Sequence, residues 1–326
     1  MSAIFLAAFY NFSLSSEHIK GGMNVKKANL ILLVLVLIIS AFAGCIQPQS
    51  EETPQITQEN TEAPTLEPTA EPETEGLKIV STVPSVTEIL FLLGCGEDII
   101  GVDSFSNYPA EAIEIEKVGD YSGFDIEKVI SLEPDVVFAG NKLQREQIDN
   151  LAGLGINVVE TEPTGFEDIT ASIIEIGKAV GKEKEANELT QSIQSVIDEI
   201  QAKTLLSSYR PSVYYVMGIG EYGNWTSGEG SFINTAMEIS GGFCVTAGSP
   251  VPWMDYPLED LIIADPDILI VSSYVLEEDL LADPTYKELT AVKEGNYYFI
   301  NPDIIERPGP RIVEALEFMQ ECFLGN

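Results

Sequence analysis

Histidine is almost absent from this chain of 326 residues, and His18 is the only one. Basic residues are also scarce: 17 lysines and arginines stand against 52 aspartates and glutamates, which gives a formal net charge of −35 at pH 7. Such a charge repels phosphate backbones and anionic lipid headgroups, so nucleic acid is not an expected partner. Without histidine beyond residue 18, the chain lacks the commonest transition-metal ligand, and we expect neither a metal site nor a cofactor.

Cysteine is equally sparse, with four residues in the whole chain. Their spacing matches no metal-ligand motif. Cys45 follows an apolar segment discussed below, and the other three are an odd number, so at least one is unpaired within a monomer. We interpret these three as small buried apolar residues: Cys95, Cys244 and Cys322.

Motifs of catalysis are missing too. The chain contains no nucleophile elbow and no glycine-rich phosphate loop. Residues 218–223 fit G-x-G-x-x-G in letters, but an aromatic segment with Trp225 follows where a helix should begin. We therefore predict a protein that is not an enzyme, with a two-lobed cleft enzyme as a distant alternative and an adhesin or cell-wall module as another.

The apolar run from Leu30 to Gly44, preceded by Lys26 and Lys27, has the design of a signal peptide. It is shorter than the roughly 20 apolar residues that a membrane-spanning helix needs. We interpret residues 1–45 as an upstream extension plus this signal peptide, with Met23 as the start of translation.

Residues 42–45 read Phe-Ala-Gly-Cys and resemble the cleavage site of a lipoprotein precursor, with Phe42 in place of the usual Leu. The resemblance implies that Cys45 becomes the lipid-carrying first residue. The protein would then be anchored by lipid at the outer face of the cytoplasmic membrane, in an extracytoplasmic location. An uncleaved or simply secreted protein is the alternative.

Residues 46–76 are rich in Thr, Glu, Gln and Pro, and contain eight glutamates and no basic residue. Such a stretch cannot bury enough apolar surface to offset the entropy lost on ordering. We predict a disordered tether that is kept extended by its prolines and by charge repulsion.

The remaining chain alternates short β-branched runs with helical patterns, which predicts an α/β fold with mostly parallel sheets. Strands are expected at 77–81, 135–139 and 156–160. Pro84 and a capping box over residues 85–88 predict the start of a helix, and Gly94 is placed to end it.

An internal repeat divides this region. Residues 127–139 and 259–271 align without a gap at an offset of 132, and each copy reads as a helix ended by a proline before a buried strand. Between the copies, residues 182–203 keep helical periodicity without Gly or Pro. We predict two Rossmann-like lobes, 77–181 and 206–326, joined by one long rigid helix over 182–205 that permits only modest lobe motion, with a ligand cleft between the lobes.

The chain resembles the helical-backbone (class III) solute-binding proteins, which serve ABC importers of cobalamin, haem and ferric siderophores. The likeness covers residues 77–323. Its markers, in chain order, are the segments 80–90, 118–121, 132–137, 226–228, 251–253 and 306–311.

This resemblance implies roles for particular residues. Glu127 and Glu259, one in each copy of the repeat, match the acidic residues that enter arginine pockets on a dimeric permease. The alternative is that each only complements the positive end of its own helix. Ligand contacts are implied in loops that face the cleft, at Pro84, Ser85, Phe105, Tyr121, Trp225 and Trp253. Asp303 and Arg307 match polar pocket residues of the cobalamin-binding members, although Arg307 could instead pair with Asp303 or Glu306, and we expect Arg311 to face the C-terminal helix.

The lack of histidine disfavours bare metal ions and haem held by histidine. Haem held by Tyr121, Tyr222 or Tyr256 remains open. Ferric siderophores are usually anionic and need several basic residues, of which few are available. We therefore expect a monomer that binds cobalamin or a related corrinoid and delivers it to an ABC permease dimer with its ATPase; a ferric siderophore or haem is the alternative ligand.

Overall fold

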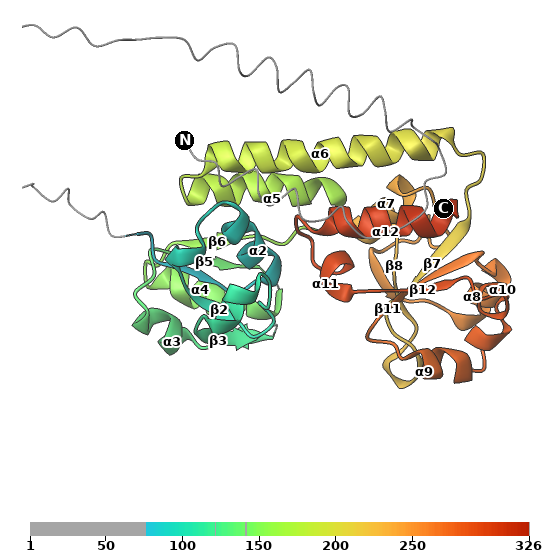
Figure 1. Cartoon of the computed structure of the whole chain (residues 1–326). Helices are drawn as coiled ribbons and strands as arrows, with labels where there is room; N and C mark the ends of the chain where they lie inside the picture. Colours follow the sequence, from blue (N-terminus) through green and yellow to red (C-terminus); the bar gives the residue numbers. More distant parts are fainter. Residues whose placement is uncertain (1–75, 121, 141, 326) are drawn as a thin grey trace, which may run out of the picture. The chain divides into compact units, whose positions relative to one another are not determined.

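The computed structural model describes residues 76–120, 122–140 and 142–325 (Figure 1). The predictions for residues 1–45, for Cys45, for nearly all of the tether and for Tyr121 lie outside these ranges. Within them, no helix has the length and apolar character required to cross a membrane.

The N-terminal lobe is built on a six-stranded sheet in the order β4-β3-β2-β1-β5-β6. All neighbouring strands are parallel except β3 and β4. The strands are β1 (Ile79–Ser81), β2 (Ile99–Asp103), β3 (Lys117–Asp120), β4 (Gly123–Phe124), β5 (Val136–Ala139) and β6 (Val158–Glu160). The helices are α2 (Pro84–Leu92), α3 (Ile126–Ser131), α4 (Arg145–Gly153) and α5 (Phe166–Ala179), with the 3-10 turns η1 (Gly96–Asp98), η2 (Ala110–Glu114) and η3 (Lys142–Gln144). The three predicted strands are therefore confirmed as β1, β5 and β6.

The C-terminal lobe has a four-stranded parallel sheet in the order β12-β11-β7-β9. Its strands are β7 (Ser212–Val216), β9 (Phe243–Cys244), β11 (Ile268–Ser272) and β12 (Tyr297–Ile300). An antiparallel ribbon is formed by β8 (Trp225–Ser227) and β10 (Trp253–Asp255). The helices are α7 (Phe232–Ile239), α8 (Leu258–Ala264), α9 (Glu277–Ala282), α10 (Thr290–Glu294), α11 (Pro302–Ile305) and α12 (Ile312–Leu324), with the turns η4 (Gly220–Tyr222) and η5 (Tyr286–Glu288). A strand follows residues 218–223, so the interpretation that no helix begins there is confirmed.

The predicted connecting helix is α6 (Glu183–Leu206), which packs on α5 of the first lobe and on α7 and α12 of the second (Figure 1). Its apolar face buries Ile193, Ile197 and Ile200 in a core cluster that includes residues of both lobes. The amide of Gln320 in α12 donates to the carbonyl of Ile200 at 2.7 Å. One continuous core beneath α6 thus joins the lobes.

The internal repeat is confirmed in three dimensions. Its two copies form α3 followed by β5, and α8 followed by β11. The only non-glycine residues with positive φ in the described ranges stand at matched positions, Glu133 at 52° and Asp265 at 36°, each directly before a proline. The following aspartates are also equivalent, because Asp135 and Asp267 each accept a backbone N–H from the neighbouring central strand at 2.8 Å. The duplication therefore extends to local backbone geometry.

The start of α2 differs from the prediction. Val83 is the N-cap residue, Pro84 occupies the first helical position, and no side chain caps the helix. Proline suits this position because its missing N–H would be unpaired there in any case. Glu88 makes no capping bond and instead binds two arginines described below, so the capping-box interpretation of residues 85–88 was wrong. At the other end, Gly94 adopts φ 79° and accommodates the left-handed turn, as predicted.

The three cysteines of the folded region are free. Cys95 and Cys244 are buried and Cys322 is partly buried against the core, which agrees with their interpretation as small apolar residues.

Candidate ligand-binding site

A cavity of about 280 Å³, here called the interlobe cavity, lies between the lobes where the parallel strands of the first lobe end. Carboxyl ends of parallel strands are the usual location of ligand sites in open α/β sheets. The first lobe contributes Thr82, Val83, Pro84, Ser85, Asp103, Phe105, Gly140, Thr161, Glu162 and Pro163, and the second contributes Phe232, Glu306, Arg307 and Pro308. Four of the predicted ligand residues, Pro84, Ser85, Phe105 and Arg307, are thereby brought together.

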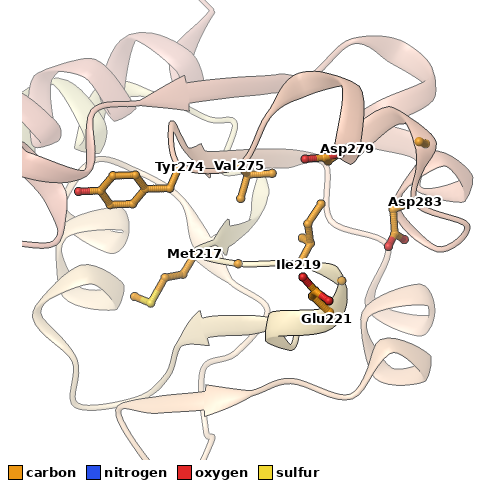
Figure 2. A pocket seen from close by; sticks show the side chains of 10 residues that line it. Met217, Ile219, Glu221, Tyr274, Val275, Asp279 and Asp283 are labelled. Atoms are coloured by element: carbon orange, nitrogen blue, oxygen red, sulfur yellow. The ribbon is translucent and has the colours of Figure 1, made fainter.

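Two further cavities lie nearby, as their shared lining residues indicate. The second, of about 320 Å³, shares Phe105, Glu306 and Arg307 with the interlobe cavity and adds Tyr274, Pro302 and Asp303. The third, of about 660 Å³, shares Tyr274 with the second and lies at the carboxyl ends of β7 and β11. Figure 2 shows Tyr274 and Met217 toward one end of this third cavity and Glu221, Asp279 and Asp283 toward the other. The three cavities therefore lie next to one another, with Phe105 and Arg307 lining the first two and Tyr274 lining the second and third.

A cluster of charged side chains joins the lobes beside these cavities. Glu88 of α2 is only 2% exposed and accepts from both Arg307 and Arg311 of the second lobe. The Glu88 carboxylate is 3.0 Å from Arg307 Nη1, and 2.9 and 2.8 Å from Arg311 Nε and Nη2. We call these three residues the interlobe ion cluster. Arg311 was expected to face the C-terminal helix, and this was wrong because the buried carboxylate of Glu88 binds it.

Both Nη nitrogens of Arg307 bind groups of the protein. Besides Glu88, its Nη1 donates to Asn107 Oδ1 at 2.9 Å, and its Nη2 donates to the carbonyl of Phe105 at 3.1 Å and pairs with Asp303 Oδ1 at 2.6 Å. A guanidinium carries two hydrogens on each Nη, and all four have acceptors here. The alternative that Arg307 pairs with Asp303 is confirmed, whereas pairing with Glu306 is not seen.

Arg311 is similarly occupied. Its Nη2 also donates to the carbonyl of Asp303 at 3.2 Å, and its guanidinium carbon lies 4.1 Å from the ring centroid of Tyr108. A cation in this position is attracted by the negative face of the ring. Tyr108 therefore supports Arg311 while remaining partly exposed.

Phe105 is held at the mouth of the cavities by a buried aspartate. Asp103 accepts from the backbone N–H of Phe105 at 2.9 Å and from the hydroxyl of Ser106. Burial raises the pKa of Asp103 although both hydrogen bonds favour its charged form. The ring of Phe105 itself is 51% exposed, so its apolar face is available to a flat ligand.

Trp225 and Trp253 lie in the ribbon of β8 and β10, not in loops as predicted. Trp225 is exposed, whereas Trp253 packs edge-on against Phe232 at a centroid distance of 5.6 Å. Neither tryptophan lines the three cavities. Because Phe232 lines the interlobe cavity, Trp253 supports the cavity wall from behind.

Several residues that line these cavities were not predicted from the sequence, and three of them carry functional groups used below: Thr161, Tyr274 and Glu306. Glu306 Oε1 accepts from the hydroxyls of Tyr215 at 2.5 Å and Ser272 at 3.0 Å. Burial raises the pKa of Glu306 and that of Tyr215. Tyr274 comes two residues after β11, so the end of the repeat's second strand was a signal that could have identified it.

Glu127 and Glu259 are exposed in the first turns of α3 and α8. An exposed isoleucine lies three residues further along each helix, Ile130 and Ile262, at matched positions of the repeat. Residues at this spacing share one helix face, so each lobe carries a carboxylate beside an apolar side chain.

Within the described ranges, no group of three or more His, Cys, Asp and Glu side chains is arranged to hold a metal ion. The site offers exposed aromatic rings, carboxylates and an unpaired hydroxyl. These groups can hold a ligand by stacking and hydrogen bonding.

Comparison with known proteins gives consistent results. The sequence profile of the family described as periplasmic binding protein matches residues 79–304. The uncharacterized ABC transporter substrate-binding lipoprotein YvrC of Bacillus subtilis is 30% identical over 308 residues, which are 91% of this chain and 97% of that protein. The vitamin B12-binding protein of Photorhabdus laumondii is 26% identical over 243 residues, covering 74% of this chain and 86% of the relative.

Among solved structures, the periplasmic heme-binding protein RhuT from Roseiflexus sp. RS-1 superposes with a TM-score of 0.71. It is 22% identical, and the match covers 77% of this chain and 98% of that chain. This likeness shows the predicted α/β fold with two lobes and a helical backbone. Together with the profile match over most of the chain, it leads to one conclusion: this chain belongs to the periplasmic binding protein family.

Proposed function

We propose that this protein is the extracytoplasmic substrate-binding component of an ABC import system and that its ligand is cobalamin or a related corrinoid. The first part is supported by the family and by the similarity to YvrC, which is named as such a lipoprotein. The second is supported by similarity to vitamin B12-binding proteins and by the electrostatics of the cleft.

The choice of ligand rests on the ion pairs and hydrogen bonds that two arginines already make within the protein. Arg307 and Arg311 already bind Glu88, Asp303 and neighbouring carbonyls. An anionic ligand, such as haem with its propionates or a ferric catecholate, would need at least one of them, and freeing it would leave Glu88 buried without a full partner. A ligand without net negative charge avoids this cost.

The carboxylates favour the same choice. Asp303 and Glu306 line the cavities, together with Asp103 and Glu162. In the described part of the lining, arginine is represented only by Arg307, which is neutralised by Glu88 and Asp303. A corrinoid presents many neutral amide N–H groups, and these can donate hydrogen bonds to the carboxylates.

Exposed aromatic residues provide the apolar contact. Phe105 is 51% exposed and Tyr274 is 69% exposed, and both line the second cavity. Burying such rings against a planar macrocycle contributes about 1.5 to 3 kcal/mol each. Two such rings would supply about 3 to 6 kcal/mol of the roughly 8 kcal/mol that micromolar affinity requires, and hydrogen bonds would supply the remainder.

Haem held by a tyrosinate is the second candidate, because Tyr274 reaches the cavities. Partial burial and the carboxylates of Asp303 and Glu306 raise the pKa of Tyr274. The phenolate needed to ligate ferric iron is therefore disfavoured at this position. For this reason haem ranks below a corrinoid.

The proposal includes docking and anchoring. Glu127 and Glu259 occupy equivalent exposed positions of duplicated units, which suits a permease with two-fold symmetry. Lipid on Cys45 would hold the protein at the outer face of the membrane, next to the permease that works with the ATPase. Exposed glutamates would serve orientation and encounter rate more than affinity.

Calorimetric titration of the purified full chain tests the ligand. Saturable binding of cobalamin at micromolar concentration or below, with weaker binding of haem and of a ferric catecholate, is the expected result. Haem binding tighter than cobalamin binding would contradict the corrinoid assignment while leaving the transport role intact.

A further inference from the structure

The interlobe cavity contains a buried hydroxyl without a partner. Thr161 follows β6 in the first lobe and is only 4% exposed. Its Oγ1 makes no hydrogen bond in the described structure, although its backbone N–H donates to the carbonyl of Ala139 at 3.0 Å. A buried hydroxyl without a partner destabilises the folded protein, so a group that binds it is expected in the functional state.

A carboxylate oxygen with spare capacity lines the same cavity from the second lobe. Tyr215 and Ser272 both donate to Glu306 Oε1, which directs and immobilises the carboxyl group. In the described structure, Oε2 accepts from neither of them, and the Nη1 and Nη2 groups of Arg307 bind other partners. Thr161, with its buried unpaired hydroxyl, and Glu306, with its second carboxylate oxygen, therefore line the same cavity from opposite lobes.

The size and lining of the cavity limit which part of a ligand it can hold. Its volume of about 280 Å³ is below the range of roughly 300 to 1,000 Å³ typical of whole drug-sized ligands, so it holds part of a bulky ligand. Pro84, Pro163, Phe232 and Pro308 make much of the wall apolar, which suits a short methylene arm. The arm must end in a group that both donates and accepts.

We propose that the interlobe cavity is a subsite for a primary carboxamide arm of the ligand, whose N–H donates to Glu306 Oε2 and whose carbonyl accepts from the Thr161 hydroxyl. This inference rests on the proposed corrinoid ligand, which carries such arms, and it assigns the contacts to residues other than Arg307. The macrocycle itself stays outside, against Phe105 and Tyr274. A carboxylic acid arm is rejected, because its charge would face the carboxylate of Glu306.

Two substitutions in the full chain test the subsite by calorimetry with cobalamin. Thr161→Val removes the hydroxyl without changing shape and should weaken binding about five-fold, the value of one neutral hydrogen bond. Glu306→Gln keeps an acceptor for Tyr215 and Ser272 but puts an NH2 group in place of Oε2. It should weaken binding about ten-fold or more.

Thermal melting separates this role from a structural one. Because the hydroxyl of Thr161 has no partner, Thr161→Val should keep or raise Tm. The matched control is Thr226→Val, since Thr226 is also buried but donates to the carbonyl of Tyr215 at 2.6 Å, and this variant should lower Tm. A fall in Tm for Thr161→Val like that of the control would overturn the proposal.

A chemical probe completes the test. Cobalamin monocarboxylic acids, in which one amide is hydrolysed, should include at least one isomer that binds the wild type about ten-fold more weakly than cobalamin. Glu306→Gln should reduce this discrimination. If the wild type binds cobalamin and both cavity variants bind it equally well, the subsite is wrong and the proposed function stands. If the wild type binds no corrinoid, the subsite and the corrinoid assignment are both wrong, and the transport role is unaffected.

Discussion

Glu306 is a carboxyl group whose surroundings oppose its ionisation. Burial raises its pKa above the ordinary value of 4.5, and the nearby Asp303 carboxylate adds to this effect, while hydrogen bonds from Tyr215 and Ser272 act against it. The folded protein therefore holds this proton to higher pH than the unfolded chain does. As pH rises from about 4.5 through the raised pKa, the ionised group costs stability.

Glu306→Gln should remove this dependence. The wild type is expected to lose stability relative to the variant as pH rises above about 4.5, and the difference should level off once Glu306 is fully ionised in the folded protein. Thermal melting of both proteins at matched ionic strength from pH 4 to pH 8 measures the difference. A difference in Tm that stays constant across this range would contradict the assignment.

Phe105 and Tyr108 belong to one loop and have similar exposure, 51% and 44%, but their environments differ. Phe105 lines two cavities, whereas Tyr108 stacks on Arg311. Phe105→Ala should therefore weaken corrinoid binding about ten-fold with little change in stability. Tyr108→Ala should reduce the free energy of unfolding by about 1 kcal/mol. Calorimetric titration measures ligand affinity and urea unfolding measures stability. Weaker binding by Tyr108→Ala together with lower stability of Phe105→Ala would contradict these roles.

At the scale of elements, the duplicated segment of α3 with β5 and α8 with β11 contains a matched pair of strained residues. Left-handed backbone costs about 1 to 2 kcal/mol for residues with a Cβ, and Glu133 and Asp265 both adopt it. The two side chains differ in the bonds that they make. Asp265 accepts from the backbone N–H and the hydroxyl of Thr290 at 2.8 and 2.7 Å, whereas Glu133 has only an exposed pairing with Lys78 at 3.6 Å.

Glycine at these two positions should therefore have different effects on stability. Glu133→Gly is expected to raise the free energy of unfolding by about 0.5 to 1 kcal/mol, because strain is relieved at little loss. Asp265→Gly should be neutral or destabilising, since the start of α10 loses its acceptor. Urea unfolding of the two variants provides the comparison, and equal effects would show that side-chain bonding at Asp265 is unimportant.

At the scale of the whole molecule, the interlobe ion cluster and α6 determine how the lobes are held. Glu88 lies in the first lobe and both arginines in the second, so the cluster spans the boundary. Removing one partner of a buried ion pair leaves the other charge unpaired, which costs about 3 to 5 kcal/mol. Glu88→Gln should lower stability by this amount and speed hydrogen exchange in α2 and in residues 302–311.

The control for this variant is Glu160→Gln. Glu160 pairs with Arg145 at 2.5 Å, but within one lobe and at the surface, where such pairs contribute less than about 1 kcal/mol. If Glu160→Gln destabilises the protein as much as Glu88→Gln, burial at the lobe boundary is not the source of the effect.

Docking is also a property of the whole molecule, because it needs both lobes. Glu127→Gln combined with Glu259→Gln should reduce ligand uptake into vesicles carrying the cognate permease and ATPase about ten-fold, with each single change having a smaller effect. Ligand affinity should stay the same, because neither residue lines the three cavities. Glu199, which is exposed on α6, offers a matched control as Glu199→Gln. Unimpaired uptake by the double variant would rule out this docking role.

The sequence by itself determined those features that depend on local patterns. Periodicity and β-branched runs located β1, β5, β6, β11 and α6 to within a few residues, and the repeat of residues 127–139 at 259–271 indicated the duplicated lobes. Gly94 was recognised because only a left-handed position requires glycine there. These are interactions between near neighbours, and the sequence records them directly.

Only the tertiary structure decided the partners of the charged and polar side chains in the cleft. Glu88 fitted a capping box by its spacing, yet it binds arginines more than 200 positions away, because a buried carboxylate must find a cation wherever the fold brings one. Glu306 and Thr161 were overlooked for the same reason: each is ordinary within its own segment. Their significance arises because the end of β6 and the end of α11, which lie far apart in the sequence, meet at one cavity.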